Sequence, residues 1–223
     1  ARRVGFADLP YQSAARPGMP VYPSRPPAQL GSGVAVAAVS PDFAPGVLLA
    51  TGRPFDVAIA GRGFLAVALP HGEIAYTRDG CLAVAADGHL VHAGSGYPLA
   101  DEIVIPEEAA AVTLRPDGRV MVSLPDGVTE AGRIQLYHFA NPEGLVARGQ
   151  NLWLAGEQAG TPQVAPPGEE GMGKLVPGML EASNVDLATE MVALLLAHRA
   201  YQLNAKSVLV GDEMWALANE LRR

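Results

Sequence analysis

The chain is poor in cysteine, in aromatic side chains and in positive charge. Its one cysteine, Cys81, excludes an intrachain disulfide. Lys and Arg together number 16 against 23 Asp and Glu, so the formal net charge is -7. Nucleic acids and anionic membranes are bound by basic patches, and we therefore expect neither as the main partner. Aromatic residues make up only 6% of the chain, so its core must be built from smaller side chains, which suit strand packing and close helix contacts.

Long apolar runs are absent as well. No stretch reaches the roughly 18–20 apolar residues that span a bilayer, so direct membrane insertion is not expected. No apolar run follows Ala1-Arg2-Arg3, so the sequence does not support a cleaved Sec signal peptide. Apolar residues still make up 49% of the 223 residues, enough for a sizeable core.

Motifs for catalysis and metal binding are also lacking. The chain has no HExxH, GxSxG or GxGxxG pattern and no EF-hand loop. His89 and His92 lie three apart beside an Asp-Gly turn, but no Cys or Glu ligand is near them in the sequence. Cys81 follows Asp79-Gly80 with no local sign of an activating base. We therefore expect a non-enzymatic protein with no catalytic residue, no cofactor and no metal site.

Residues 1–50 are predicted to form an extended, proline-rich arm with short strands. Their prolines exclude a helix and favour polyproline or edge-strand conformations. Apolar residues such as Phe6 and Met19 punctuate the segment, as expected of an arm that lies on a neighbouring surface; a disordered tail is the alternative. Val34–Val39 is predicted to be a short strand.

Residues 51–177 are predicted to form an antiparallel β-rich domain. Turn signals recur every 8–10 residues or so, among them Asp79-Gly80, Asp87-Gly88 and Asp117-Gly118. No βαβ alternation is present, which argues against a doubly wound sheet. Residues 156–178 are rich in Gly, Pro and Glu and are predicted to be a loop. The strands are expected at 56–60, 64–69, 74–77, 82–84, 90–92, 103–105, 112–114, 120–122 and 134–139.

Residues 178–223 are predicted to form a turn and then a long amphipathic helix, from about Val185 to Leu221. This segment has no proline after Ser183, and its start can be capped by Ser183 or Asn184. Asp186 and Glu190 place negative charge in the first turns, where the helix dipole favours it. The fold class expected is thus mainly β, with an extended arm and a coiled-coil-type terminal helix.

Positions spaced alternately by four and three residues form an apolar stripe along this helix. A helix of roughly 55 Å is too long for the β domain to cover, so the stripe needs another long helix from a second chain or from residues outside this one. A single helix packed across the β domain is the alternative. The stripe residues predicted to lie in a subunit interface are Leu187, Met191, Leu194, His198, Tyr201, Ala205, Val208 and Trp215.

Three stretches together resemble bacterial flagellar basal-body rod proteins. The first runs from Phe55 to Val67 and continues in Tyr76-Thr77-Arg78-Asp79-Gly80, like the family's "DVAI-G-GFF-V…YTRDG" signature. The second, 178–186, reads GMLEASNVD, like the family's "G-LE-SNV" approach to a terminal helix. The third, 198–206, reads HRAYQLNAK, like "QRAYE-N-K" in that helix.

The resemblance implies a structural subunit of the flagellar rod. Such subunits polymerise with copies of themselves into a rigid tube that spans the periplasm and transmits torque to the hook. They are exported by the flagellar type III apparatus, and they adjoin proximal rod, hook and surrounding ring proteins. Family members begin with a helix of roughly 30 residues and an "ANxxTxGFK" motif, neither of which is present here, and that helix is the expected partner of the terminal one.

A further match in the arm indicates the distal rod. The residues that resemble the segment marking distal rod subunits, and that are predicted to lie in a subunit interface, are Tyr11, Gln12, Arg16, Pro17 and Gly18. The other motifs are shared with proximal rod and hook subunits, which remain alternatives. A secreted β-rich binding module or carbohydrate-active enzyme is the alternative from another class, and it would require a concave site with convergent polar groups.

Overall fold

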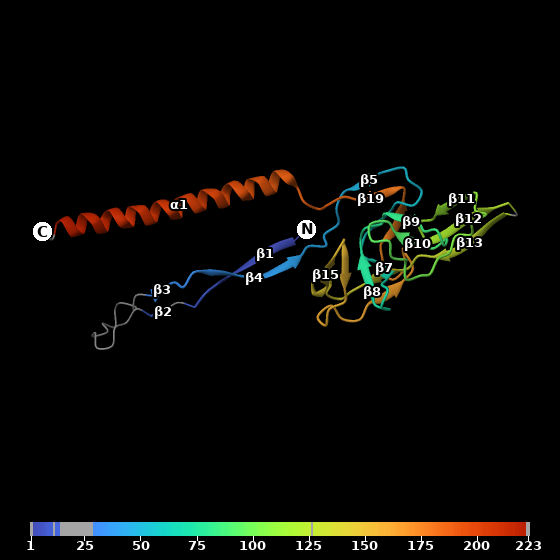
Figure 1. Ribbon diagram of the computed structural model, residues 1–223, viewed down its shortest axis with the longest axis horizontal. Coiled ribbons are helices and arrows are strands. Elements are labelled where there is room, and N and C mark those ends of the chain that lie inside the picture. The colour runs from blue at the N-terminus through green and yellow to red at the C-terminus, as the bar shows by residue number, and fades with distance from the viewer. Residues whose placement is uncertain (1, 11, 14–28, 126, 222–223) are drawn as a thin grey trace. The chain divides into compact units, whose positions relative to one another are not determined.

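The computed structural model describes residues 2–10, 12–13, 29–125 and 127–221. The chain forms two compact units, Ala1–Ser183 and Asn184–Arg223. The first unit is built of β-strands and the second is a single long helix, α1 (Leu187–Glu220) (Figure 1). The expected fold class, mainly antiparallel β with one long C-terminal helix, is confirmed.

The first unit begins with a hairpin that leads into a larger set of strands. We call the described residues within 2–41 the arm hairpin and the described residues within 48–181 the β body. The arm hairpin contains β1 (Arg2–Asp8), β2 (Gln12–Ser13), β3 (Gln29–Leu30) and β4 (Val34–Pro41). The β body contains β5 (Leu48–Ala50), β6 (Val57–Ala60), β7 (Leu65–Ala68), β8 (Ile74–Thr77), β9 (Leu82–Val84), β10 (Leu90–His92), β11 (Ala111–Leu114), β12 (Arg119–Leu124), β13 (Gly127–Arg133), β14 (Leu136–His138), β15 (Val146–Gly149), β16 (Leu152–Leu154), β17 (Gln163–Ala165), β18 (Lys174–Pro177) and β19 (Met179–Glu181), with a 3-10 turn at Pro142–Gly144.

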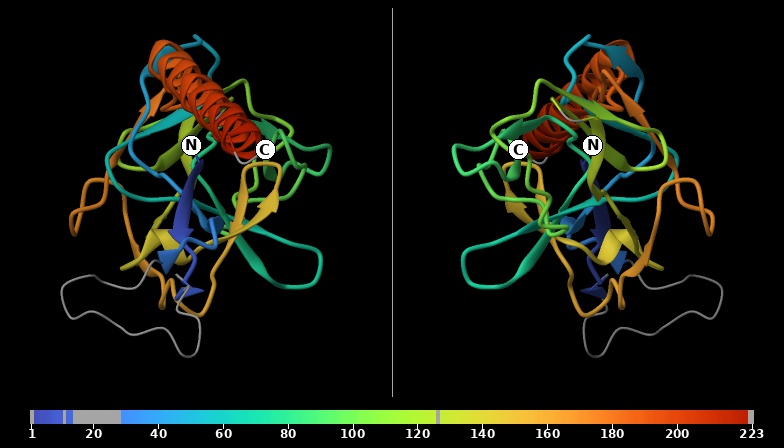
Figure 2. Two further views of the ribbon diagram at one scale, coloured as in Figure 1. Left: turned by 90° about the vertical axis from the view of Figure 1, so that its left-hand side faces the viewer. Right: turned by 90° about the vertical axis from the view of Figure 1, so that its right-hand side faces the viewer.

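The strand pairs of the β body are antiparallel, as the regular turn signals predict. A four-stranded sheet has the order β15-β16-β8-β7, and a three-stranded sheet has the order β11-β12-β13. Shorter pairs, β9 with β10, β14 with β17 and β6 with β18, close the body. In the end views of Figure 2 the strands surround a central region rather than forming one flat sheet.

Two hydrophobic clusters fill this central region. The larger one is built mainly from aliphatic side chains such as Ile59, Leu65 and Leu136, all almost fully buried. The smaller one is aromatic and centres on Phe64, Tyr76 and Phe139. Among the residues that the structure describes, all 28 buried apolar ones belong to the β body, so the described core lies there.

The chain leaves the β body toward its two ends from neighbouring strands. β5 follows the arm hairpin and β19 precedes the helix, and the two pair with Leu48 opposite Glu181 and Ala50 opposite Met179. Next to them β6 pairs with β18. Segments about 130 residues apart in the sequence are therefore joined here, because the backbone groups of β5 and β19 hydrogen-bond to each other.

Three local predictions are wrong. Ile103–Ile105 forms no strand: Ile103 and Ile105 are buried, but only Val104 makes an isolated bridge, with His89. The segment 156–178 is not all loop, because β17 and β18 lie in it. Because this segment is rich in glycine and proline, its sequence pattern does not indicate these short strands. Pro177 is tolerated because it is the last residue of β18.

The helix cap is the third error. Asp186, rather than Ser183 or Asn184, is the N-cap of α1. Its carboxylate accepts hydrogen bonds from Ala188 N at 3.3 Å, from Thr189 N at 3.2 Å and from Thr189 Oγ1 at 2.6 Å. The Thr189 hydroxyl contributes most to lowering the pKa of this carboxyl. The charge that was expected only to favour the helix dipole also satisfies the first free N–H groups.

Candidate assembly surfaces

The helix α1 exposes apolar side chains along its whole length. It contains 34 residues, and none of them is buried. At about 1.5 Å per residue it is roughly 50 Å long. Residues of the predicted stripe are largely open to solvent within this single chain, with exposed fractions of 72% for Leu187, 70% for Leu194, 74% for Tyr201 and 73% for Trp215. Met191, His198, Ala205 and Val208 are exposed too.

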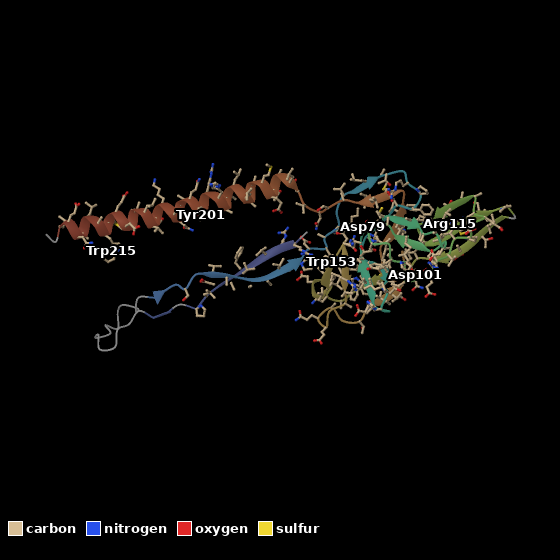
Figure 3. The ribbon with its side chains drawn as sticks, in the orientation of Figure 1. Asp79, Asp101, Arg115, Trp153, Tyr201 and Trp215 are labelled. Atoms are coloured by element: carbon tan, nitrogen blue, oxygen red, sulfur yellow. The ribbon has the colours of Figure 1, made fainter. Side chains whose placement is uncertain are left out.

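A second apolar row runs along a different side of the helix. It consists of Val192, Leu196, Leu203, Val210 and Met214, all of them exposed. At about 100° per residue these positions lie roughly 140–180° around the helix from Leu187. Figure 3 shows side chains projecting from all around α1, with Tyr201 and Trp215 labelled. The sequence analysis did not identify this row, although its spacing of four and seven residues was a visible signal.

A helix that is apolar on two sides must be covered on two sides. One long partner helix covers one stripe only, so α1 requires at least two neighbouring elements. Within the described residues, no helix is long and apolar enough to cross a membrane.

The arm hairpin carries a second exposed apolar surface. β1 pairs with β4 so that Val4 faces Val39 and Phe6 faces Val36. A bulge between Gly5 and Phe6 places Ala37 outside the register. Val36 and Val39 are three residues apart and would otherwise point to opposite faces of the hairpin, so the bulge brings both valines to one face.

This face is exposed to solvent, with exposed fractions of 70% for Phe6 and 59% for Val36. On the other face, Arg3 and Ser40 are followed by the small residues Gly5, Ala7, Ala35 and Ala38. A two-stranded ribbon without a covering layer is marginally stable in water. The arm hairpin thus has the properties of a segment that packs on a partner.

Most of the arm residues predicted to lie in an interface cannot be placed. Tyr11, Arg16, Pro17 and Gly18 lie outside the described residues. Gln12 lies in β2, opposite Leu30 of β3. Gln12 is therefore part of the β2–β3 strand pair, and the interface role of all five residues stays a prediction.

A partly buried ion pair joins the two ends of the β body. The guanidinium of Arg78 donates to Glu181 Oε2 from Nη2 at 2.8 Å and from Nε at 3.1 Å. Its Nη1 also donates to the carbonyls of Gly61 and Gly63. Glu181 Oε1 accepts from the backbone N–H of Gly46 at 2.9 Å. One charge pair thus ties the β6–β7 turn, the end of β8, the link to the arm hairpin and the strand that leads to α1.

A second polar cluster lies beside this anchor. His92, with an exposed fraction of 1%, has Nδ1 2.9 Å from Ser95 Oγ and Nε2 3.5 Å from Asp79 Oδ2. Asp79 also accepts from Asn151 Nδ2 and from the N–H of Cys81. Contact with His92 is the largest of the influences that lower the pKa of Asp79 to about 2. These bonds hold three turns together.

The residues weighed for metal or thiol chemistry remain dispersed. Among the described ranges, no three side chains of His, Cys, Asp or Glu gather in a way that could hold a metal ion. Cys81 is half-buried, and its Sγ accepts a hydrogen bond from Arg53 Nη2 at 3.1 Å. Arg53 also pairs with the buried Asp56 at 2.8 Å. These contacts position the turn after β8.

Two family models match the chain. Residues 58–122 match the flagellar hook protein FlgE/F/G D1 domain. Residues 176–221 match the flagellar basal body rod FlgEFG protein C-terminal region. The first match covers much of the β body, and the second covers β19 and α1.

Individual relatives match over nearly the whole chain. The flagellar basal-body rod protein FlgG of Borreliella burgdorferi is 39% identical, over 99% of this chain and 86% of that protein. FlgG of Caulobacter vibrioides is 37% identical, over the same two shares. The flagellar hook protein FlgE of Salmonella typhimurium is 36% identical, but over only 49% of this chain and 27% of that protein.

Proposed function

This chain belongs to the FlgG family of flagellar basal-body rod proteins, and on that premise we propose that it is a structural subunit of the distal rod. In this role copies of the chain polymerise into a rigid tube that transmits torque to the hook. The observation that supports this best is the match of the FlgG relatives from the arm hairpin to α1. The role is structural, and the chemistry of the chain serves folding and assembly.

The exposed apolar surfaces of the chain support a subunit whose neighbours cover these surfaces in the polymer. The apolar side chains of α1 and of the arm hairpin are exposed in the single chain, whereas the β body has a complete core. We propose that the predicted stripe on α1 forms subunit contacts, together with the arm residues Tyr11, Gln12, Arg16, Pro17 and Gly18. We also propose three functional parts: an arm over residues 1–50, a β domain over 51–177 and a terminal helix over 178–223.

The remaining partners and the location follow from the same proposal. The rod would lie in the periplasm within the basal body and would adjoin proximal rod, hook and ring proteins. Its subunits would be exported by the flagellar type III apparatus. A hook subunit is disfavoured, because the hook relative matches only half of this chain, whereas FlgG relatives match nearly all of it. The match to FlgG relatives over nearly the whole chain also disfavours a secreted β-rich binding module or carbohydrate-active enzyme.

Electron microscopy of basal bodies tests this proposal. The chain would be epitope-tagged at its exposed His71 turn and expressed in a bacterium that lacks its own copy. We expect gold label on the rod below the hook, and basal bodies without a completed rod when the gene is deleted. Label on the hook, or complete rods in the deletion strain, would contradict the distal rod assignment.

A further inference from the structure

The arm hairpin is joined to the β body by the link 42–47. β1 and β4 pair with Arg2 opposite Pro41, so both strands of the hairpin reach this joint. Among the described residues, no strand of the arm hairpin shares a sheet with a strand of the β body. Apart from the covalent link, side-chain contacts at the joint therefore decide how the hairpin is held.

An aromatic side chain in this link packs on the β body. The Phe43 ring lies edge to face against Phe64, with the ring centroids 5.2 Å apart, and against Trp153 of β16, with the centroids 4.8 Å apart. Phe64 is 2% exposed and belongs to the aromatic cluster, and the other two rings pack against that cluster. Edge-to-face pairs at such distances stabilise a structure beyond the area that they bury. Phe43 thus attaches the link to the core of the β body.

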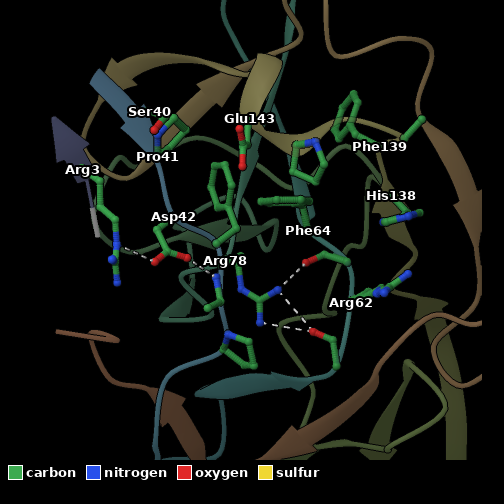
Figure 4. A pocket seen from close by; sticks show the side chains of 17 residues that line it. Arg3, Ser40, Pro41, Asp42, Arg62, Phe64, Arg78, His138, Phe139 and Glu143 are labelled. Atoms are coloured by element: carbon green, nitrogen blue, oxygen red, sulfur yellow. Dashed lines mark hydrogen bonds and ion pairs between the residues drawn. The ribbon is translucent and has the colours of Figure 1, made fainter. Parts of the chain in front are cut away.

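The start of β1 contacts the same indole. The guanidinium carbon of Arg2 lies 5.8 Å from the ring centroid of Trp153, within the range of a cation–π contact. Next to it, Arg3 Nε lies 3.4 Å from Asp42 Oδ2 (Figure 4). The Arg3 side chain is 79% exposed, so this ion pair contributes little, because water screens exposed pairs. Both strands of the hairpin are therefore held, and the indole is the stronger point of attachment.

A pocket of about 790 Å³ also lies at the joint. Arg3 and Ser40 line it on the side of the arm hairpin (Figure 4). Arg62, Phe64 and Phe139 line it on the side of the β body. Because open space separates the two sides here, the end of the hairpin is not packed against the β body over this area. The joint therefore depends on the few contacts made by the rings and by the start of β1.

We propose that Phe43 is a positioning residue, which fixes the arm hairpin to the β body so that the exposed apolar face of the arm is presented to a neighbouring copy in one place. Without this ring the link 42–47 acts as a hinge, and the hairpin moves into the space of the pocket. The consequence for assembly rests on the proposed function, since it requires a polymer of this chain. A surface that is correctly placed in only a fraction of the copies binds more weakly in proportion to that fraction.

A distance measurement on the purified full chain tests the joint. In a Cys81→Ser background, spin labels at Ala35→Cys in β4 and at His71→Cys in the β7–β8 turn report the distance between the arm hairpin and the β body by double electron–electron resonance. Both labelled positions are exposed. We expect one narrow distance distribution when Phe43 is present. Phe43→Ala should raise the ratio of displaced to held arms about tenfold, because two aromatic pairs are lost.

Two variants serve as controls for this measurement. Phe43→Tyr keeps the ring and should keep the narrow distribution. Phe6→Ala removes the same side chain from the arm hairpin at an exposed position that does not line the pocket, and it should leave the distribution narrow as well. If Phe43→Ala also lowers the unfolding midpoint of the β body, Phe43→Leu decides, because leucine keeps an apolar side chain at the core but no ring. A broad distribution with Phe43 present, or a narrow one in the deciding variant, would overturn the proposal.

Rod counts test the consequence for assembly separately. Phe43→Ala and Phe43→Tyr would each be introduced into the chromosomal gene, and complete rods would be counted by electron microscopy. We expect a loss of complete rods with alanine and an unchanged count with tyrosine. If the unaltered chain builds no rods, the proposed function fails, while the distance measurement still decides the role of Phe43. If alanine displaces the arm and the rod count is unchanged, the placement of the arm is not needed for assembly, and this part of the proposal is wrong.

Discussion

Arg78 and Glu181 form an ion pair across 103 residues of sequence, with a shortest distance of 2.8 Å and exposed side-chain fractions of 16% and 10%. Both residues lie in motifs of the rod family, the "YTRDG" stretch and the approach to the terminal helix. The pair fixes the strand before α1 to the turn that follows β6, because the remaining guanidinium donors bond to Gly61 and Gly63. The strand that leads to α1 is therefore held to the β body by a charged, hydrogen-bonded contact in addition to its pairing with β5.

Removal of the guanidinium is expected to destabilise the β body strongly. Arg78→Met leaves Glu181 largely buried without its partner, and breaking such a pair costs about 3–5 kcal/mol when it is fully buried. We expect about 2–4 kcal/mol here, since both side chains keep some contact with water. Urea unfolding followed by tryptophan fluorescence measures this, through Trp153. Arg119→Met, whose pair with Asp117 is about half exposed, should cost less than about 1 kcal/mol. Equal losses for the two variants would contradict the anchoring role.

Asp79 makes the stability of the β body sensitive to acid. Contact with His92 and bonds from Asn151 and Cys81 lower the pKa of Asp79 to about 2, from 3.8. A carboxyl with a depressed folded pKa stabilises the fold above the unfolded pKa, and this contribution is lost as the pH falls from about 4 toward 2. The shift corresponds to about 2 kcal/mol. Unfolding free energies measured from pH 5 to pH 2 should fall less steeply for Asp79→Asn than for the unaltered chain. Parallel curves would show that Asp79 is not the responsible group.

The pKa of Asp101 is shifted in the opposite direction from that of Asp79. Burial raises its pKa to about 6, although Gln135 N donates to Oδ2 at 3.0 Å. A carboxyl with a raised folded pKa favours the folded state most below 3.8, and this contribution is lost as the pH rises through 6. At pH 7 the chain therefore keeps a carboxylate in a poorly hydrated site. Asp101→Asn keeps an acceptor for Gln135 N, and we expect it to stabilise the fold at pH 7 by about 1–2 kcal/mol, after allowance for partial hydration.

The measurement for Asp101 is a thermal or urea midpoint at pH 7 and at pH 4. The gain in stability should be present at pH 7 and should shrink at pH 4, because there Asp101 is protonated and neutral in the folded chain, like the asparagine amide of the variant. Asp87→Asn, an exposed position that also accepts a backbone hydrogen bond, from His89, should show no comparable gain. A loss of stability at pH 7 would mean that the charge of Asp101 is needed.

Local signals in the sequence identify much of the β body. Asp-Gly turns at 87–88 and 117–118 mark the β9–β10 and β11–β12 hairpins correctly, because an Asp-Gly pair suits a tight turn. Asp79-Gly80 instead lies between β8 and β9, which belong to different sheets. β1 was not predicted, since Arg2-Arg3-Val4-Gly5-Phe6 has weak strand character and its partner β4 begins about 30 residues later. Strand pairing over such distances depends on the partner and not on local propensity.

The assembly surfaces could be predicted only in part. The stripe from Leu187 to Trp215 follows from spacing along one helix, and spacing is a local property. The Arg78–Glu181 anchor and the pocket beside Arg62 depend on residues that meet only after folding. The cap Asp186 was misassigned because Ser183, Asn184 and Asp186 are all good caps, and only backbone geometry decides among them.

The two apolar rows of α1 lead to a last prediction, about assembly. Leu194 on the predicted stripe and Leu196 on the second row have exposed fractions of 70% and 61% in the single chain. A charge placed at a buried apolar contact is strongly unfavourable unless it is paired. If both rows are covered in the rod, Leu194→Asp and Leu196→Asp should each abolish rod formation, while the β body stays folded because it shares no core with α1.

Gln202→Glu is the matched control, because it places the same charge on the same helix at an exposed polar position where the family's "QRAYE-N-K" segment has glutamate. It should build rods in numbers close to those of the unaltered chain, as counted by electron microscopy of basal bodies. Circular dichroism and the unfolding midpoint of the β body should be unchanged in all three variants. Rods formed by Leu194→Asp would refute the assembly role of the stripe. Rods formed by Leu196→Asp alone would mean that one layer of partners covers α1 and that the second row faces water, because a charge is tolerated only where solvent reaches it.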